Sequence, residues 1–184
     1  VPNSAGIPRH VRDNVVVLPQ NDLEACTRIL TAEGHDLACV VMELQAGAGG
    51  VIMLDRAFVA GIREVTRELG ILLVIDETIT FRAGYHGMQG IYDVTPDLTI
   101  LGKTIGGGMP IGAVGGRADL FEMGENGFVY HSGTHHGHPL AAAAGIACLN
   151  VLDESAYLKL DTMAQRIKTN LNSWCAERGH PFVV

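Results

Sequence analysis

Hydrophobic residues along this chain fall into short uninterrupted runs and into stripes at helical spacing. Short apolar runs predict strands over Val15–Leu18, Leu37–Met42, Ile71–Ile75, Leu98–Leu101 and Ile111–Val114, and the run Ile71–Ile75 is uninterrupted. Continuous rather than alternating runs are typical of parallel strands that helices cover on both faces. Between the second and third runs, apolar residues recur three and four positions apart and predict a helix over Arg56–Leu69. This alternation of strand and helix predicts an α/β fold with a mostly parallel sheet.

Three further helices are expected from local signals. Asn21 followed by Glu24 resembles a capping box and predicts that a helix begins there. An uncharged, Ala-rich run predicts a buried helix over Leu140–Leu152. An apolar stripe predicts a long helix over Ser155–Glu177.

The composition mainly excludes classes of protein. The 13 basic and 20 acidic residues give a net charge of −7 without a basic cluster, which argues against a nucleic-acid or anionic membrane partner. With 47% hydrophobic and 18% charged residues, the chain is too apolar to be disordered. The apolar run 140–152 is shorter than the ~20 residues of a membrane span, and no leader sequence is expected. Four widely spaced cysteines favour reduced thiols and a cytoplasmic location.

Polar residues stand at the ends of three expected strands: Glu43, Asp76 and Lys103. Ligands of open α/β sheets bind beyond the carboxyl ends of the strands. A lysine there can attack carbonyl groups, although one that merely reaches to water fits the position equally well. A carboxylate such as Asp76 can hold a protonated pyridine nitrogen, whereas a lone Asp is more often a cap. The pair Asp76 and Lys103 at two strand ends favours a catalytic site.

Short motifs suggest two other functions. A zinc site is suggested by a cluster of imidazoles, but no cysteine or carboxylate lies near it in sequence, so a polar loop is favoured. That cluster consists of His131, His135, His136 and His138. Gly102–Thr104 resembles the end of a phosphate-binding loop, but Asp97 stands where such a loop needs glycine. We therefore reject a nucleotide-binding loop.

Several segments together resemble the class III pyridoxal-phosphate aminotransferases, especially the branch around glutamate-1-semialdehyde 2,1-aminomutase. The matching segments are Val41–Gly50, Leu73–Glu77, Val94–Leu98, Leu101–Pro110 and Ser132–Thr134. Their order and spacing extend over most of the chain. The resemblance implies the large domain of pyridoxal-phosphate fold type I, with a mostly parallel sheet flanked by helices, present here incompletely.

The resemblance also implies roles for individual residues. Lys103 matches the lysine that bonds to pyridoxal phosphate and then moves a proton, and Asp76 matches the partner of the pyridine nitrogen. Thr78 stands where the family usually has a valine against the ring. The remaining matches are Tyr130, Gly133 and Thr134. In the family this segment reaches the phosphate of the cofactor in the neighbouring subunit, so the resemblance implies a homodimer with shared active sites. No metal is implied.

The implied activity is transfer of an amino group between an amino acid or amine and a carbonyl acceptor. The alternative is the intramolecular reaction of the aminomutase, and the alternative of another class is a non-enzymatic or metal-binding fragment. Gln45 and His138 depart from the residues usual in the family. Because family members carry further segments before and after this one, we expect an inactive central fragment. Residues 1–152 would then form part of the cofactor-binding large domain. Residues 153–184 would form a long helix that leads towards a missing C-terminal domain. A further strand is expected to begin near residue 181.

Overall fold

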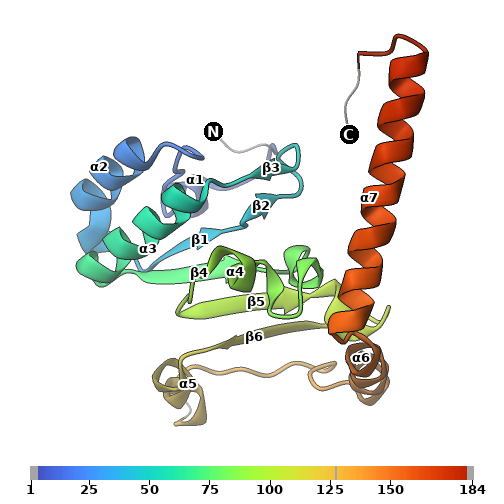
Figure 1. Ribbon diagram of the computed structural model, residues 1–184. Helices are drawn as coiled ribbons and strands as arrows, with labels where there is room; N and C mark the ends of the chain where they lie inside the picture. Colours follow the sequence, from blue (N-terminus) through green and yellow to red (C-terminus); the bar gives the residue numbers. More distant parts are fainter. Residues whose placement is uncertain (1–3, 127, 182–184) are drawn as a thin grey trace.

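The fold is organised around one four-stranded sheet. The computed structural model describes residues 4–126 and 128–181, and its main strands lie in the order β1-β4-β5-β6 (Figure 1). Strands β1, β4 and β5 run parallel, and β6 pairs antiparallel with β5. Their bounds are Cys39–Met42 for β1, Leu72–Asp76 for β4, Leu98–Gly102 for β5 and Gly112–Gly116 for β6. The predicted α/β fold is confirmed, with one antiparallel edge.

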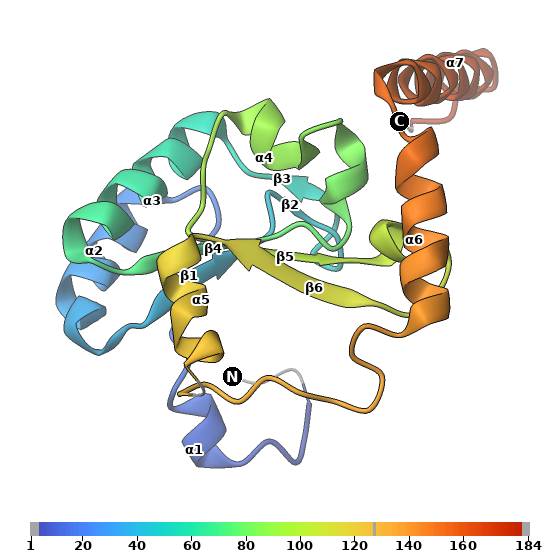
Figure 2. The same ribbon diagram turned by 90° about the horizontal axis from the view of Figure 1, so that it is seen from below.

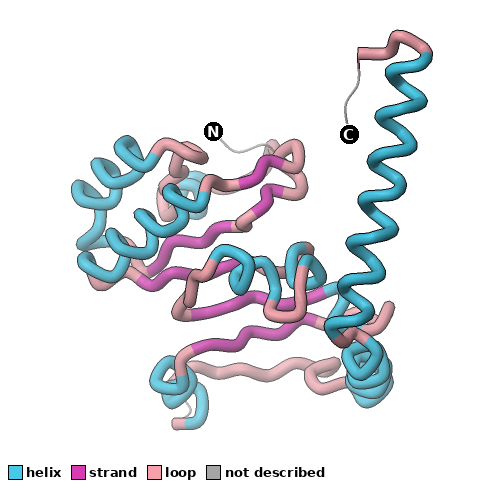
Figure 3. Tube along the Cα trace, in the orientation of Figure 1, coloured by secondary structure: helices cyan, strands magenta, loops and turns pink. Residues whose placement is uncertain are grey.

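Helices and a small hairpin surround this sheet (Figure 3). A second, antiparallel pairing joins β2 (Gln45–Ala46) to β3 (Ile52–Met53) between β1 and α3. The α-helices are α1 (Arg9–Arg12), α2 (Leu23–Glu33), α3 (Arg56–Leu69), α4 (Gly87–Tyr92), α5 (Ala118–Glu125), α6 (Pro139–Val151) and α7 (Glu154–Glu177). Short 3₁₀ turns are η1 (Gly34–Asp36), η2 (Thr80–Ala83) and η3 (Lys103–Gly106). Helix α7 projects from the body (Figure 1), and no helix in the described ranges is long and apolar enough to cross a membrane.

The hydrophobic core lies where α2 and α3 pack against β1 and β4. Leu30, Ile62 and Leu73 come from α2, α3 and β4, and each exposes at most 1% of its surface. Burying such side chains contributes about 2 kcal/mol each. The core therefore fixes β4, whose carboxyl end carries Asp76.

Two expectations for the first part of the chain are wrong. Val15–Leu18 forms no strand, because no described strand lies beside it to complete a ladder, and Val17 remains 80% exposed. Helix α2 is capped by Asp22, whose carboxylate accepts the Ala25 N–H. Asn21 instead adopts left-handed backbone and binds the loop after β3, through Met53 O and Asp55 N.

The expected buried helix over Leu140–Leu152 is present as α6 but is largely exposed. Ala141 and Gly145 are buried, whereas the side of Leu140, Ile146 and Val151 is open to solvent. The helix has apolar residues on all sides, a pattern typical of helices that are covered all round. Only one face is covered by the residues that the structure describes. The further strand expected near residue 181 falls mainly on 182–184, outside the described residues.

A buried ion network ties the amino end of β5 to its neighbours. Asp97 is 3% exposed and accepts hydrogen bonds from Arg63 of α3 at 2.6 Å, Arg117 at 3.0 Å and the N–H of Leu73 at 2.8 Å. Burial alone raises the pKa of Asp97, but hydrogen bonds from Arg63, Leu73 and Arg117 outweigh it and hold that pKa well below its usual range. The carboxylate therefore joins α3, β4 and the start of α5.

Replacing Asp97 by Asn should lower the free energy of unfolding by about 3 kcal/mol at pH 7, because Arg63 would remain buried without its counter-ion. Since the folded pKa lies below the unfolded value of ~3.9, this contribution is complete above that value and is lost as the pH falls below it. Urea unfolding at several pH values measures both effects. Asp119→Asn, which removes the exposed partner of Arg117, is the control and should change stability little. Equal losses in the two variants would contradict the assigned role.

Candidate active site

Asp76 and Lys103 lie at the same edge of the sheet. Asp76 is the last residue of β4 and pairs in register with Ile100 of β5, and Lys103 directly follows the end of β5. The two strands are parallel, so their carboxyl ends meet at one edge. Asp76 is partly buried and Lys103 is exposed. The structure thus brings together the amine and the carboxylate that the sequence singled out.

Thr78 connects these two strand ends. Its N–H donates to Asp76 Oδ1 at 2.8 Å and closes a turn that fixes this carboxylate oxygen. The other oxygen, Oδ2, has no hydrogen-bond partner among the described residues. A Cβ added to Gly102 would lie 3.2 Å from Thr78 Cγ2, so the threonine packs directly against the strand end before Lys103. Asp76 therefore keeps one oxygen for a cationic partner.

Lys103 has an unusual backbone conformation. Its φ of +47° lies in the left-handed region, which costs a residue with a side chain about 1–2 kcal/mol. Such strain persists only where surrounding structure imposes it, and it is concentrated at functional sites. The turn η3 that begins at Lys103 continues into Gly107, which also has left-handed backbone.

Helix α6 holds this turn in place through direct backbone contact. A Cβ on Gly145 of α6 would overlap the carbonyl oxygen of Ile105, and a Cβ on Gly107 would overlap that of Ala144. Gly145 of α6 thus packs on the turn η3, and Gly107 after that turn packs on α6, with no side chain between the two backbones. This packing explains why α6, 40 positions further along the chain, belongs to the support of Lys103.

Tyr130, Gly133 and Thr134 lie apart from that edge. They belong to the segment between α5 and α6, which Figure 2 shows as an extended loop crossing below the sheet. All three are exposed, and the Tyr130 side chain is 88% exposed. Within the described part of the chain, no hydrogen bond or ring contact joins them to Asp76 or Lys103. The structure therefore does not bring these residues to the same place as the strand-end pair.

The histidines of this loop do not form a metal site in the structure. The rings of His131 and His136 are 4.9 Å apart between centroids, and those of His135 and His138 are 5.9 Å apart. In the residues that the structure describes, no group of three or more histidine, cysteine or acidic residues is arranged to hold a metal ion. The geometry gives no support to the zinc hypothesis.

Sequence reasoning missed two residues at this edge, Glu77 and Gly145. Glu77 is fully buried directly after Asp76. A signal was available, since a second acidic residue continuing a buried strand has to find partners inside the protein. Gly145 left no such signal, because a glycine in an Ala-rich helix does not reveal what it contacts.

The fold and the strand-end pair define a class of protein. A helix-flanked, mostly parallel sheet with an antiparallel edge strand is the fold of the large domain of pyridoxal-phosphate enzymes of fold type I. The chain belongs to the class-III aminotransferase family, whose model matches residues 3–180.

Curated relatives agree with this assignment. Over 186 residues the chain is 43% identical to a glutamate-1-semialdehyde 2,1-aminomutase of Nitratidesulfovibrio vulgaris, covering 100% of this chain and 44% of the relative. It is 41% identical to glutamate-1-semialdehyde 2,1-aminomutase 1 of Bacillus cereus, covering 98% of this chain and 43% of that protein. The chain thus spans less than half the length of these relatives.

Solved structures show the same fold. An omega-transaminase from Sphaerobacter thermophilus superposes with a TM-score of 0.93 at 36% identity, covering 97% of this chain and 42% of that one. A transaminase with PLP bound superposes with a TM-score of 0.93 at 30% identity, covering 98% of this chain and 44% of that one. A glutamate-1-semialdehyde aminomutase variant from Pseudomonas aeruginosa in complex with PMP gives 0.79 at 28% identity, covering 96% and 42%.

Pyridoxal phosphate is the cofactor of this family, and the residues at the strand ends suit it chemically. An exposed amine at Lys103 suits the aldehyde of the cofactor, and the unpaired Oδ2 of Asp76 suits a protonated ring nitrogen. The two groups lie at the ends of neighbouring strands, and the aldehyde and the ring nitrogen of the cofactor likewise belong to one ring.

Proposed function

We propose that this chain provides the cofactor-binding part of a pyridoxal-phosphate-dependent aminotransferase. Its reaction is the transfer of an amino group between an amino acid or amine and a carbonyl acceptor. The observation that carries the proposal is the pairing of Asp76 and Lys103 at the carboxyl ends of adjacent parallel strands. Membership of the class-III aminotransferase family supports it.

Each residue has a distinct task in this proposal. When bound, pyridoxal phosphate supplies an aldehyde for amines and a ring that withdraws electrons. Thr78 N–H holds Asp76 Oδ1, which leaves Oδ2 to accept a hydrogen bond from the ring nitrogen and to stabilise its positive charge if the cofactor were bound. Lys103 Nζ would hold the cofactor through its aldehyde group and would serve as the base that accepts and returns a proton. Thr78 also packs beside the strand end where the ring would lie.

Covalent labelling tests the assignment of the lysine. Pyridoxal phosphate is added to the full-length protein, the linkage is reduced with borohydride, and labelled peptides are identified by mass spectrometry. We expect the label on Lys103. The other two lysines of this chain, Lys159 and Lys168, lie on α7 and serve as internal controls. A label on either of them without one on Lys103 would contradict the proposal.

A second candidate is the intramolecular reaction of an aminomutase. The curated relatives at 41% and 43% identity carry that name, which supports this reaction as an alternative to the first. Lys103 and Asp76 would perform the same tasks in both reactions. The two are distinguished by giving the full-length protein glutamate-1-semialdehyde alone. Product formed without any other amino donor or acceptor supports the aminomutase, and a strict need for a second substrate supports the aminotransferase.

We further propose a homodimer whose two active sites are shared between subunits. The exposed apolar residues of α6, together with Phe128 at 84% and Tyr130 at 88% exposure, support a covering surface from another subunit. Thr134 lies in the same exposed segment, and a hydroxyl group is a suitable partner for a phosphate. In this arrangement Thr134 of one chain serves the cofactor held by Lys103 of the other.

Complementation between two inactive variants tests the shared sites. Lys103→Ala and Thr134→Ala proteins are dissociated, mixed and reassociated, and activity is compared with each variant treated alone. Random pairing should restore roughly a quarter of the unmodified activity, because half the dimers are mixed and one of their two sites is intact. Confirmed subunit exchange without any gain would show that both residues act within one chain.

Helix α7 supports a further domain beyond the large one. Its apolar stripe is exposed, with Met163, Ile167 and Trp174 each about half open to solvent. We propose that residues 153–184 lead towards a C-terminal domain that packs on this stripe. The four free cysteines support a reducing, cytoplasmic location for the whole protein.

A further inference from the structure

Glu77 is a buried charge without a counter-ion. Its side chain is completely inaccessible to solvent, and none of the basic residues described forms an ion pair with it. Removing a carboxylate from water is costly unless hydrogen bonds compensate. The hydrogen-bond donors to the Glu77 carboxylate therefore show which segments of the chain this residue holds together.

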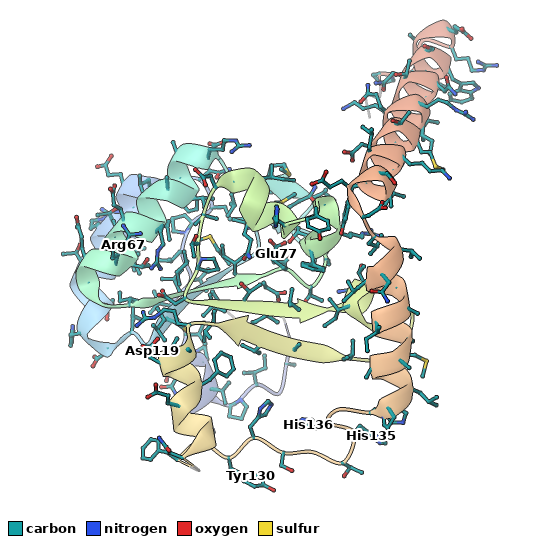
Figure 4. The ribbon with its side chains drawn as sticks, turned by 60° about the horizontal axis from the view of Figure 1, so that its bottom comes forward. Arg67, Glu77, Asp119, Tyr130, His135 and His136 are labelled. Atoms are coloured by element: carbon teal, nitrogen blue, oxygen red, sulfur yellow. The ribbon has the colours of Figure 1, made fainter. Side chains whose placement is uncertain are left out.

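All the donors to Glu77 come from the segment 80–89. The carboxylate accepts hydrogen bonds from the Thr80 hydroxyl and from the backbone N–H groups of Met88 at 3.3 Å and Gln89 at 2.7 Å. Figure 4 shows Glu77 between the sheet and α4, the helix to which Met88 and Gln89 belong. A Cβ on Gly87 would lie only 2.7 Å from Glu77 Oε1, so the helix start packs tightly on the carboxylate. Glu77 thus fastens η2 and α4 over the end of β4.

The same residue lies inside the turn that orients Asp76. The Asp76 carboxylate is held by the N–H of Thr78, so Glu77 is the middle residue of that turn. The Glu77 N–H donates to Ile100 O of β5 at 2.9 Å. Because the backbone of Glu77 is tied to β5 and its side chain to α4, it cannot rotate without moving Asp76 or Thr78.

A second link closes the arrangement. Gln89 Oε1 accepts a hydrogen bond from the Thr99 hydroxyl of β5 at 3.0 Å. The segment that Glu77 fastens is thereby joined to the strand that ends at Lys103. Both residues of the proposed site consequently depend on one buried group of hydrogen bonds.

We propose that Glu77 is a positioning residue that keeps the free oxygen of Asp76 directed at the cofactor's ring nitrogen. It acts through the backbone of the turn 76–78 and does not touch the cofactor itself. This inference rests on the proposed function.

The test compares variants of the full-length protein. Glu77→Ala removes both acceptor oxygens, and Glu77→Gln retains one of them. Gly87→Ala presses on the carboxylate without removing it, and the φ of +70° at Gly87 also strains any side chain placed there. Asp97→Asn is the matched control, because Asp97 is an equally buried, hydrogen-bonded carboxylate at the opposite end of the same strands. Three quantities are measured: the dissociation constant of pyridoxal phosphate, the pH dependence of its visible absorbance when bound, and amide exchange at Met88 and Gln89 without cofactor.

Glu77→Ala should weaken cofactor binding by about tenfold, the change that loss of one charge-assisted hydrogen bond brings. It should also shift the pH dependence and speed amide exchange at Met88 and Gln89. Glu77→Gln should restore these properties in part, because its amide keeps one acceptor oxygen but sets an NH2 group against the donors of the other. Asp97→Asn should lower stability without changing them. If Glu77→Ala does not fold, Gly87→Ala decides, and it should shift the same pH dependence.

Three results would overturn the inference. The first is unchanged cofactor binding and pH dependence in folded Glu77→Ala, or in Gly87→Ala if Glu77→Ala does not fold. The second is a change of the same size in Asp97→Asn. The third is a Glu77→Gln protein that is as impaired as Glu77→Ala. Failure of the proposed function would look different. The unmodified protein would then show no visible absorbance that depends on Lys103.

Discussion

Replacing Lys103 by Ala should lower the turnover of the full-length protein by at least about 10⁴-fold, the upper range of what a positioned proton-transfer group supplies. Lys103 is the only lysine at the edge of the sheet in the described structure, so no neighbouring lysine can take over its two tasks. Steady-state kinetics measure the loss. The visible absorbance of bound cofactor should disappear in the same variant, and thermal unfolding should remain close to that of the unmodified protein.

Two lysines of α7 provide the control for this substitution. Lys159→Ala and Lys168→Ala change the same residue type at exposed positions of the projecting helix. Both variants should keep normal turnover and absorbance. Substantial activity in Lys103→Ala, with loss in either control, would place the essential amine on α7 instead.

Replacing Asp76 by Asn should slow turnover by about 10³-fold while the cofactor still binds covalently to Lys103. The amide keeps the shape of the side chain and can still hold the Thr78 N–H, but it lacks the charge that stabilises a protonated ring nitrogen. Losses of this size are typical when one electrostatic contact to the reacting group is removed. Single-turnover kinetics and the yield of borohydride labelling separate the two effects.

The isosteric change at Asp97 again serves as the comparison. Asp97→Asn alters a buried carboxylate of the same sheet at the opposite end of its strands, so it tests whether a slower reaction simply reflects a less stable fold. It should retain turnover under conditions where the protein is folded. Near-normal turnover in Asp76→Asn would show that Asp76 only caps the turn after β4.

The strands and long helices could be predicted because their signals are local. The run around Leu73 is continuous and apolar, the run around Ile100 is apolar except for Thr99, and both form parallel strands within a residue or two of the expected bounds. The pair Asp76 and Lys103 followed from the same signals, since residues directly after parallel strands share an edge. Lys103 could therefore be placed before its neighbours were known.

The errors arose where a structure depends on distant partners. Val15–Leu18 has the composition of a strand, but a strand exists only beside another one, and none lies there among the described residues. Asn21 was a reasonable cap by residue type, yet its side chain is used for Met53 and Asp55, more than 30 positions away. Glu77 was missed for the same reason, because its donors lie up to 12 positions further along the chain.

The contact between α6 and the turn at Lys103 determines how forces reach the proposed site. Side chains normally act as a compliant layer between packed elements, since they can change rotamer and absorb small displacements. Gly107 and Gly145 remove that layer, so the backbones of the helix and the turn pack directly on each other. In the proposed homodimer, a second subunit packed on the exposed side of α6 would thus be in direct mechanical contact with the turn that begins at Lys103.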